Sequence, residues 1–200
     1  MSLTSIFFTF FFYISVLIFI TGVSYKIVQY WQTPAPLKIP IAPAPLNRIG
    51  VLMRIAREVF LFQSLFKASK WTWIFGWSFH LALVLLFFRH LVYFWPGEIP
   101  TILLKTEPLK YAAYPLIFGL LGLLSRRLFV DRVRYISAPS DYLMLLLLIV
   151  IGGSGMLMTF AQNHPNMLLV KNFAEGLITF NWSELPSELL FLAHIFLVFL

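Results

Sequence analysis

The chain has 200 residues, of which 60% are hydrophobic and only 12% are charged, and phenylalanine alone occurs 22 times. A soluble domain of this size needs more surface charge, so the composition predicts an integral membrane protein. Cysteine is absent, which excludes an iron–sulfur cluster, a thiolate zinc site, covalent c-type haem and a disulfide within this chain. The net charge of +7 would suggest nucleic acid in a soluble protein, but the charges are placed as in membrane loops, so no nucleic-acid partner is expected.

Apolar segments follow one another along the chain and predict an all-α bundle of five transmembrane helices in a single domain. They run from about Leu3 to Tyr25, Trp71 to Trp95, Tyr111 to Leu128, Tyr142 to Phe160, and Ser187 to Leu200. The first has no preceding basic residue and no small-residue cleavage site, which favours a retained helix over a signal peptide. The last has only 14 residues, whereas a span needs about 20. We therefore expect an incomplete fifth helix at the C-terminus, as in a fragment.

Basic residues gather in two of the loops between these segments. The first loop, 26–70, and the short loop 126–134 together carry eleven lysines and arginines, whereas the loops 96–110 and 161–188 carry three. The positive-inside rule then places the N-terminus outside and the two basic loops in the cytoplasm. The prediction is a multi-pass protein of the cytoplasmic (inner) membrane.

The first cytoplasmic loop has two parts with different patterns. Thr33–Pro45 contains five prolines and should be extended and stiff. Arg48–Lys70 mixes basic residues with apolar ones at three- and four-residue spacing, which predicts an amphipathic helix on the inner membrane surface. Anchoring by anionic lipid and docking of a cytoplasmic partner both remain open as its role.

Two histidines, His80 and His90, lie inside the second apolar segment, ten residues apart. On a helix this spacing rises about 15 Å, which places the imidazoles at two membrane depths. An ionisable group in the membrane is costly unless it has a partner, and imidazole is the usual axial ligand of b-type haem. The pair therefore indicates a membrane cytochrome, or else two histidines that only hydrogen-bond neighbouring helices.

The depths of the histidines favour haem. His90 lies five residues before Trp95, and His194 is the eighth residue from Ser187, so both should lie in the outer half of facing helices, as a bis-histidine haem requires. His80 lies deeper and would need a partner near the cytoplasmic end of the fifth helix, beyond residue 200. His164 precedes Pro165 in a polar run and is interpreted as a solvated loop residue.

Small residues occur in the third and fourth segments, at Gly119 and Gly122 and in Gly152–Gly155. They would let a neighbouring helix or a porphyrin face approach closely. Ordinary helix packing is the preferred of these two interpretations.

Several stretches resemble the respiratory nitrate reductase gamma-subunit family of membrane cytochromes b. Trp77–His90 is similar to the second helix of that family, Arg126–Tyr142 to its loop between the third and fourth helices, and Leu190–His194 to its fifth helix. The Pro-rich segment and Glu58–Lys67 are closer to the cytochrome b subunit of the DsrMKJOP complex of sulfur-metabolising prokaryotes.

The resemblance implies a five-helix bundle with two b haems that exchanges electrons with menaquinone or another quinone. It implies that His90 and His194 ligate the outer haem and that His80 holds one side of the inner haem, whose last ligand would lie beyond this chain. Lys110 stands where the nitrate-reductase relatives carry a quinone-site lysine, although a lysine snorkelling at a helix end is an equal alternative. Arg89 would pair with a haem propionate or reach the interface.

The expected function is that of a dihaem electron-transfer subunit between the quinone pool and a cytoplasmic iron–sulfur subunit of the HdrD-like type, in a sulfur-metabolism respiratory complex. Further membrane and periplasmic subunits, including a cytochrome c, are implied partners. The domain then divides into a first span (1–28), a Pro-rich and amphipathic segment (29–70) and a haem-binding four-helix part (71–200). A haem-free membrane anchor is the main alternative. A proton or ion carrier is weaker, because the spans contain no acidic relay residue.

Overall fold

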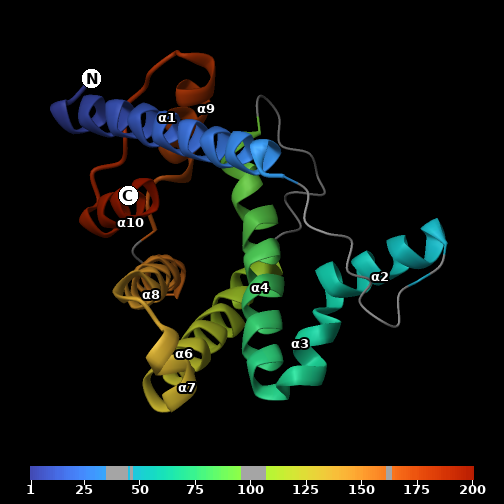
Figure 1. Cartoon of the computed structure of the whole chain (residues 1–200). Helices are drawn as coiled ribbons and strands as arrows, with labels where there is room; N and C mark the ends of the chain where they lie inside the picture. Colours follow the sequence, from blue (N-terminus) through green and yellow to red (C-terminus); the bar gives the residue numbers. More distant parts are fainter. Residues whose placement is uncertain (35–44, 46, 96–106, 161–163) are drawn as a thin grey trace.

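The computed structural model describes residues 1–34, 45, 47–95, 107–160 and 164–200, and in these ranges all regular structure is helical. The elements in chain order are α1 (Leu3–Gln32), α2 (Arg48–Leu61), α3 (Gln63–Ala68), α4 (Lys70–Phe94), the 3-10 helix η1 (Glu107–Ala112), α6 (Ala113–Phe129), α7 (Asp131–Ile136), α8 (Pro139–Phe160), α9 (Met167–Thr179) and α10 (Leu189–Phe199). Figure 1 shows α8, α9 and α10 on one side of α4, and α2 and α3 on the other.

Within the described ranges, four helices are long and apolar enough to cross a membrane: α1, α4, α8, and α6 with the preceding turn (Pro108–Phe129). The apolar C-terminal helix α10 is shorter. This confirms the predicted all-helical class, with four helices that could cross a membrane, while the predicted fifth span stays a prediction. Helix α1 continues to Gln32 rather than ending near Tyr25, and its large apolar residues such as Leu17 and Phe19 are exposed, as lipid-facing residues are.

Helix α6 packs between α4 and α8, and glycines make its contact with α4 close. A Cβ atom at Gly119 would lie 2.7 Å from the Phe75 carbonyl oxygen, and one at Gly122 would overlap the Phe75 ring. Leu116 and Leu120 of α6 and Ala82 of α4 form the buried centre of this packing. Gly119 and Gly122 therefore serve helix packing, the preferred interpretation of the sequence.

A second apolar core joins α1, α9 and α10. It consists of Phe8, Val170, Phe173, Leu177, Leu185 and Phe191. Helix α9 was missed by the sequence interpretation, which treated residues 161–188 as an outer loop. The signal was present, because Val170, Phe173, Ala174 and Leu177 are the buried positions of α9 and have the spacing of one helical face.

The predicted amphipathic helix forms, but it is broken in two at Phe62, which adopts a left-handed φ of 48°. The Glu58 carboxylate caps the second piece by accepting hydrogen bonds from the backbone N–H of Ser64 at 2.9 Å and from its hydroxyl at 2.6 Å. These two bonds hold the pKa of Glu58 below its usual value. Trp73 of α4 donates its indole N–H to the Leu61 carbonyl at 2.7 Å and thereby attaches the end of α2 to α4.

The apolar side chains of α2, among them Ile49, Leu52 and Phe60, are exposed, and α2 extends away from the other helices in Figure 1. This is compatible with a helix that lies on a membrane surface. Most of the Pro-rich segment Thr33–Pro45 lies outside the described residues, so its predicted extended form stays a prediction.

Side-chain contacts show which helix ends lie beside one another. The Glu184 carboxylate, just before α10, accepts a hydrogen bond from the Ser5 hydroxyl of α1 at 2.8 Å. The Tyr93 hydroxyl near the end of α4 donates to the Met167 sulfur at the start of α9, at 3.4 Å. The start of α1 therefore lies beside the segment before α10, and the end of α4 lies beside the start of α9. The predicted order in which the helices cross the membrane stays a prediction. Which side faces the cytoplasm stays a prediction.

Candidate haem-binding site

Two of the candidate ligands, His80 and His90, lie on α4, and their rings are held in the same way. The Nδ1 atom of His80 lies 2.7 Å from the Gly76 carbonyl oxygen, and that of His90 lies 2.7 Å from the Leu86 carbonyl oxygen. A carbonyl oxygen can only accept, so Nδ1 must carry the proton in both rings. In the neutral imidazole this leaves the lone pair on Nε2, the atom that is then available for a metal.

The Nδ1 atom of His194, on α10, is also protonated, but its hydrogen-bond partner belongs to another helix. Its Nδ1 lies 2.8 Å from the hydroxyl oxygen of Ser154, on α8. That hydroxyl donates to the Ile151 carbonyl oxygen at 2.9 Å, so it accepts the hydrogen bond from Nδ1–H. His194 is half-buried, and its Nε2 also keeps the lone pair.

His90 and His194 lie within electrostatic range of each other, although they belong to helices separated by almost a hundred residues of sequence. The His90 ring also lies edge-on to Tyr93 at 6.0 Å between ring centroids, and Tyr93 packs against the α1–α9–α10 core. The equal membrane depth expected from the sequence and the role of these residues as ligands both stay predictions.

His80 has different surroundings. Its ring is exposed and is flanked edge-on by Phe62 at 5.0 Å and by Phe79 at 4.8 Å between ring centroids. The left-handed residue that breaks the amphipathic helix therefore lies directly against a candidate ligand. His164 is exposed and non-helical, in agreement with its interpretation as a loop residue.

The two candidate cations lie at different places in the fold. Lys110 lies in η1, half-buried, with its Nζ 5.6 Å from the centroid of the Tyr111 ring. Arg89 is half-buried in the last turns of α4, directly before His90. The proposed roles of Lys110 at a quinone and of Arg89 at a haem propionate stay predictions.

These side chains fit haem b better than a bare metal ion. In the ranges that the structure describes, no three His, Asp or Glu side chains gather as a metal site would require. A porphyrin supplies most of the iron ligands itself, so one imidazole on each face suffices. Two imidazoles whose Nδ1 atoms are hydrogen-bonded, on different apolar helices, are this kind of donor set.

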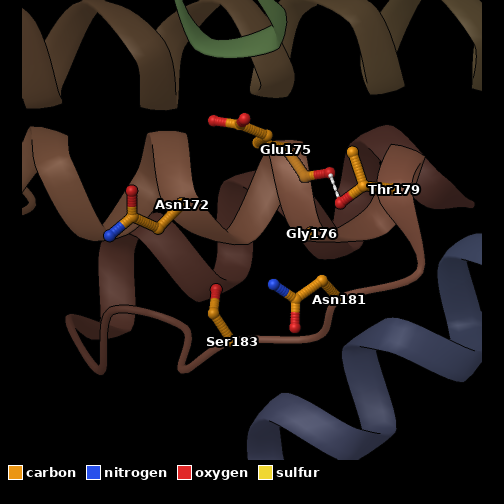
Figure 2. A pocket seen from close by; sticks show the side chains of 6 residues that line it. All are labelled: Asn172, Glu175, Gly176, Thr179, Asn181 and Ser183. Atoms are coloured by element: carbon orange, nitrogen blue, oxygen red, sulfur yellow. Dashed lines mark hydrogen bonds between the residues drawn. The ribbon is translucent and has the colours of Figure 1, made fainter. Parts of the chain in front are cut away.

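A feature that the sequence did not reveal is a hollow of about 260 Å³ beside α9. Figure 2 shows its lining, formed by Asn172, Glu175, Gly176, Thr179, Asn181 and Ser183. Gly176 is needed there because the Asn181 carbonyl oxygen occupies the place of a side chain. The Ser183 hydroxyl is buried without a hydrogen-bond partner among the described residues. None of the predicted site residues lines this hollow.

Comparison with known proteins relates the chain to subunits of oxidoreductases. The family model described as nitrate reductase gamma subunit matches residues 46–200. The chain is 30% identical, over 210 aligned residues, to the Hdr-like menaquinol oxidoreductase cytochrome b-like subunit of Archaeoglobus fulgidus, and the alignment covers 84% of this chain and 63% of the relative. It is 29% identical, over 228 residues, to the subunit of the same name in Archaeoglobus profundus, with 93% and 67% covered. The chain thus spans slightly less than two thirds of the length of the first relative. With more than half of its length matched, it belongs to the nitrate reductase gamma subunit family.

Proposed function

We propose that this chain is a dihaem b-type membrane cytochrome subunit that exchanges electrons between the quinone pool and a cytoplasmic iron–sulfur partner. The observation that carries the proposal is the pair of imidazoles on α4 and α10, which are close to each other and whose Nδ1 atoms both have hydrogen-bond partners. The names of the two Archaeoglobus relatives support menaquinol as the quinone species and a partner of the Hdr-like type.

The chain's own residues would hold the cofactor from two helices. His90 of α4 and His194 of α10 would hold one haem through Nε2, and His80, about 15 Å further along α4, would help to hold a second. Haem b, when bound, supplies reversible one-electron transfer at its iron. The apolar side chains of α4 and α10 would keep water away from the bound haem.

Lys110 and Arg89 would provide positive charge near the site. An ammonium group can donate hydrogen bonds to a quinone oxygen, and a guanidinium can pair with a carboxylate in a bidentate manner. We assign Lys110 to the quinone and Arg89 to a haem propionate.

The partner would dock on the basic side of the protein. This chain has no cysteine, so an iron–sulfur cluster must be held by another subunit. The end of α6 and helix α7 carry Arg126, Arg132 and Arg134 on this basic side of the protein. Arg134 forms an ion pair with Asp131 at 2.8 Å. We propose an HdrD-like iron–sulfur subunit as the partner, and further membrane and periplasmic subunits, including a cytochrome c, in a complex of sulfur metabolism.

A haem-free membrane anchor is the second candidate, because each of the three histidines already has a hydrogen-bond partner. Only the bond between His194 and Ser154 joins two helices, however. The bonds of His80 and His90 stay within α4 and attach it to nothing, which an anchor role does not explain.

The deciding experiment is the dithionite-reduced minus oxidised visible spectrum of the purified protein, with haem quantified per chain. A b-type spectrum that also appears on addition of a menaquinol analogue supports the proposal. A colourless, folded preparation that stays empty when haem is supplied would leave the anchor as the function.

A further inference from the structure

We propose that Ser154 is a positioning residue for the haem ligand His194. It would orient the imidazole and set its basicity from a neighbouring helix, and Gly155 would leave the ring the space to take this orientation. This inference rests on the proposed haem function and concerns how one of its ligands is held.

The first observation is the burial of Ser154. It is the buried residue of α8, with 8% of its surface exposed, in a helix that is otherwise open to its surroundings. A buried hydroxyl in an apolar environment is costly unless its hydrogen-bonding capacity is used. Here the hydroxyl donates to the Ile151 carbonyl and accepts from His194, so it is used in both directions.

The second observation is the difference from the other two candidate ligands. His80 and His90 each bond the carbonyl one turn earlier in their own helix. Helix α10 begins at Leu189, so His194 lies near its start, and its Nδ1 bonds a side chain of α8 instead. The orientation of the His194 ring therefore depends on how α8 and α10 pack, and the Ser154 hydroxyl and the nearby Ile151 carbonyl of α8 make the connection.

The third observation is the space beside the ring. A Cβ atom at position 155 would lie 3.3 Å from Cε1 of His194 and 3.8 Å from its Nδ1. The glycine thus permits the close approach of the imidazole to α8, and a larger residue would turn or displace the ring. The two adjacent positions act together, since one holds the ring and the other makes room for it.

The physical consequence follows from the ligand's basicity. A hydrogen bond accepted from Nδ1–H makes the imidazole a stronger donor at Nε2 and fixes its tautomer. Stronger donation favours the ferric state over the ferrous state. Loss of the Ser154 hydroxyl should therefore weaken haem binding and raise the midpoint potential of the haem that His194 holds.

The test compares Ser154→Ala with Ser154→Thr, and uses Thr159→Val as the matched control. Thr159 lies on the same helix, and its hydroxyl donates to the Gly155 carbonyl of its own helix, at 2.8 Å. Two properties are measured on the membrane protein: transfer of haem to an excess of a soluble haem-binding protein, and the midpoint potentials from a potentiometric titration.

We expect Ser154→Ala to weaken haem retention about tenfold, the lower end of the usual effect for such partners, and to raise the midpoint potential of one haem only. Ser154→Thr should restore both properties, and Thr159→Val should leave both unchanged. Gly155→Ala keeps the Ser154 hydroxyl but crowds the His194 ring, so it should also change the midpoint potential of the same haem. This variant keeps the proposal testable if Ser154→Ala does not fold.

Haem retention and potentials in Ser154→Ala equal to those of Thr159→Val would overturn this inference and leave the proposed function intact. If Ser154→Ala does not fold, wild-type midpoint potentials in Gly155→Ala would overturn the inference. A wild-type protein that takes up no haem would overturn the proposed function, and the inference with it.

Discussion

The two ends of α4 hold their histidines in different environments. At one end His90 is close to His194 of another helix, whose ring is bonded to a third helix through Ser154. At the other end the exposed His80 bonds the Gly76 carbonyl of its own helix and is flanked edge-on by Phe62 from the break between α2 and α3. The first environment depends on the packing of α4, α8 and α10, whereas the second depends on α4 and on the segment attached to its start.

This difference has a consequence for how each end responds to change. A ligand pair formed by several helices is lost when any of them shifts, because ligand geometry tolerates little displacement. A ring held by its own helix keeps its orientation as long as that helix persists. Perturbations of the His194 end should therefore alter the candidate site more than those at the His80 end.

The largest expected effect comes from removing the histidines. We expect His90→Ala and His194→Ala to lose the same haem, because each removes one axial ligand of one iron, and His80→Ala to spare that haem. The measurement is haem per chain, with the reduced minus oxidised spectrum of each variant. His164→Ala, at an exposed loop position, is the control. Equal haem content in all four variants would contradict the assignment.

The packing of α4 against α6 should be the next most sensitive feature. We expect Gly119→Ala to destabilise the protein by about 1–3 kcal/mol, since its Cβ atom would press on the Phe75 backbone in a packed interface. Gly153→Ala is the control, because a Cβ atom there meets nothing within 4 Å and should be neutral or slightly stabilising. Unfolding in detergent, followed by circular dichroism, measures both. A neutral Gly119→Ala would contradict the close contact.

Removal of the Trp73 hydrogen bond should loosen the His80 end. We expect Trp73→Phe to cost about 0.5–1.5 kcal/mol, because the indole N–H no longer reaches the Leu61 carbonyl, and to speed proteolysis between α2 and α3. Trp71, which is 72% exposed, provides the control variant Trp71→Phe. Identical cleavage rates in the two variants would show that Trp73 does not fasten α2.

The smallest expected effect is a pH dependence at the His194 end. Hydrogen bonds from Ser5, from the terminal amino group and from Ser2 lower the pKa of Glu184 from 4.5 to about 2. A lowered pKa means that the folded state prefers the carboxylate, so this stabilisation is complete above pH 4.5 and is lost as the pH falls toward 2. The thermal midpoint of the wild type should fall over this range more than that of Glu184→Gln. Parallel pH profiles for the two proteins would refute the contribution of Glu184.

The sequence predicted the four long helices and the short fifth one, because each is a continuous apolar run. Its prediction that His90 and His194 lie at the same membrane depth, which rests on helical rise and topology, stays a prediction. It missed α9, whose polar flanks resemble a loop, and the break at Phe62, which depends on the Glu58–Ser64 cap. It also missed the contact between Ser154 and His194, since two residues 40 positions apart meet only through the packing of α8 and α10.

The most direct test of the central claim is electron paramagnetic resonance of the oxidised, haem-loaded protein, compared with His194→Ala. A haem held by His90 and His194 should give a low-spin ferric signal from two imidazole ligands, and this signal should turn high-spin or disappear in the variant. The same low-spin signal in wild type and variant would contradict the account, since His194 would then not be a ligand of that iron.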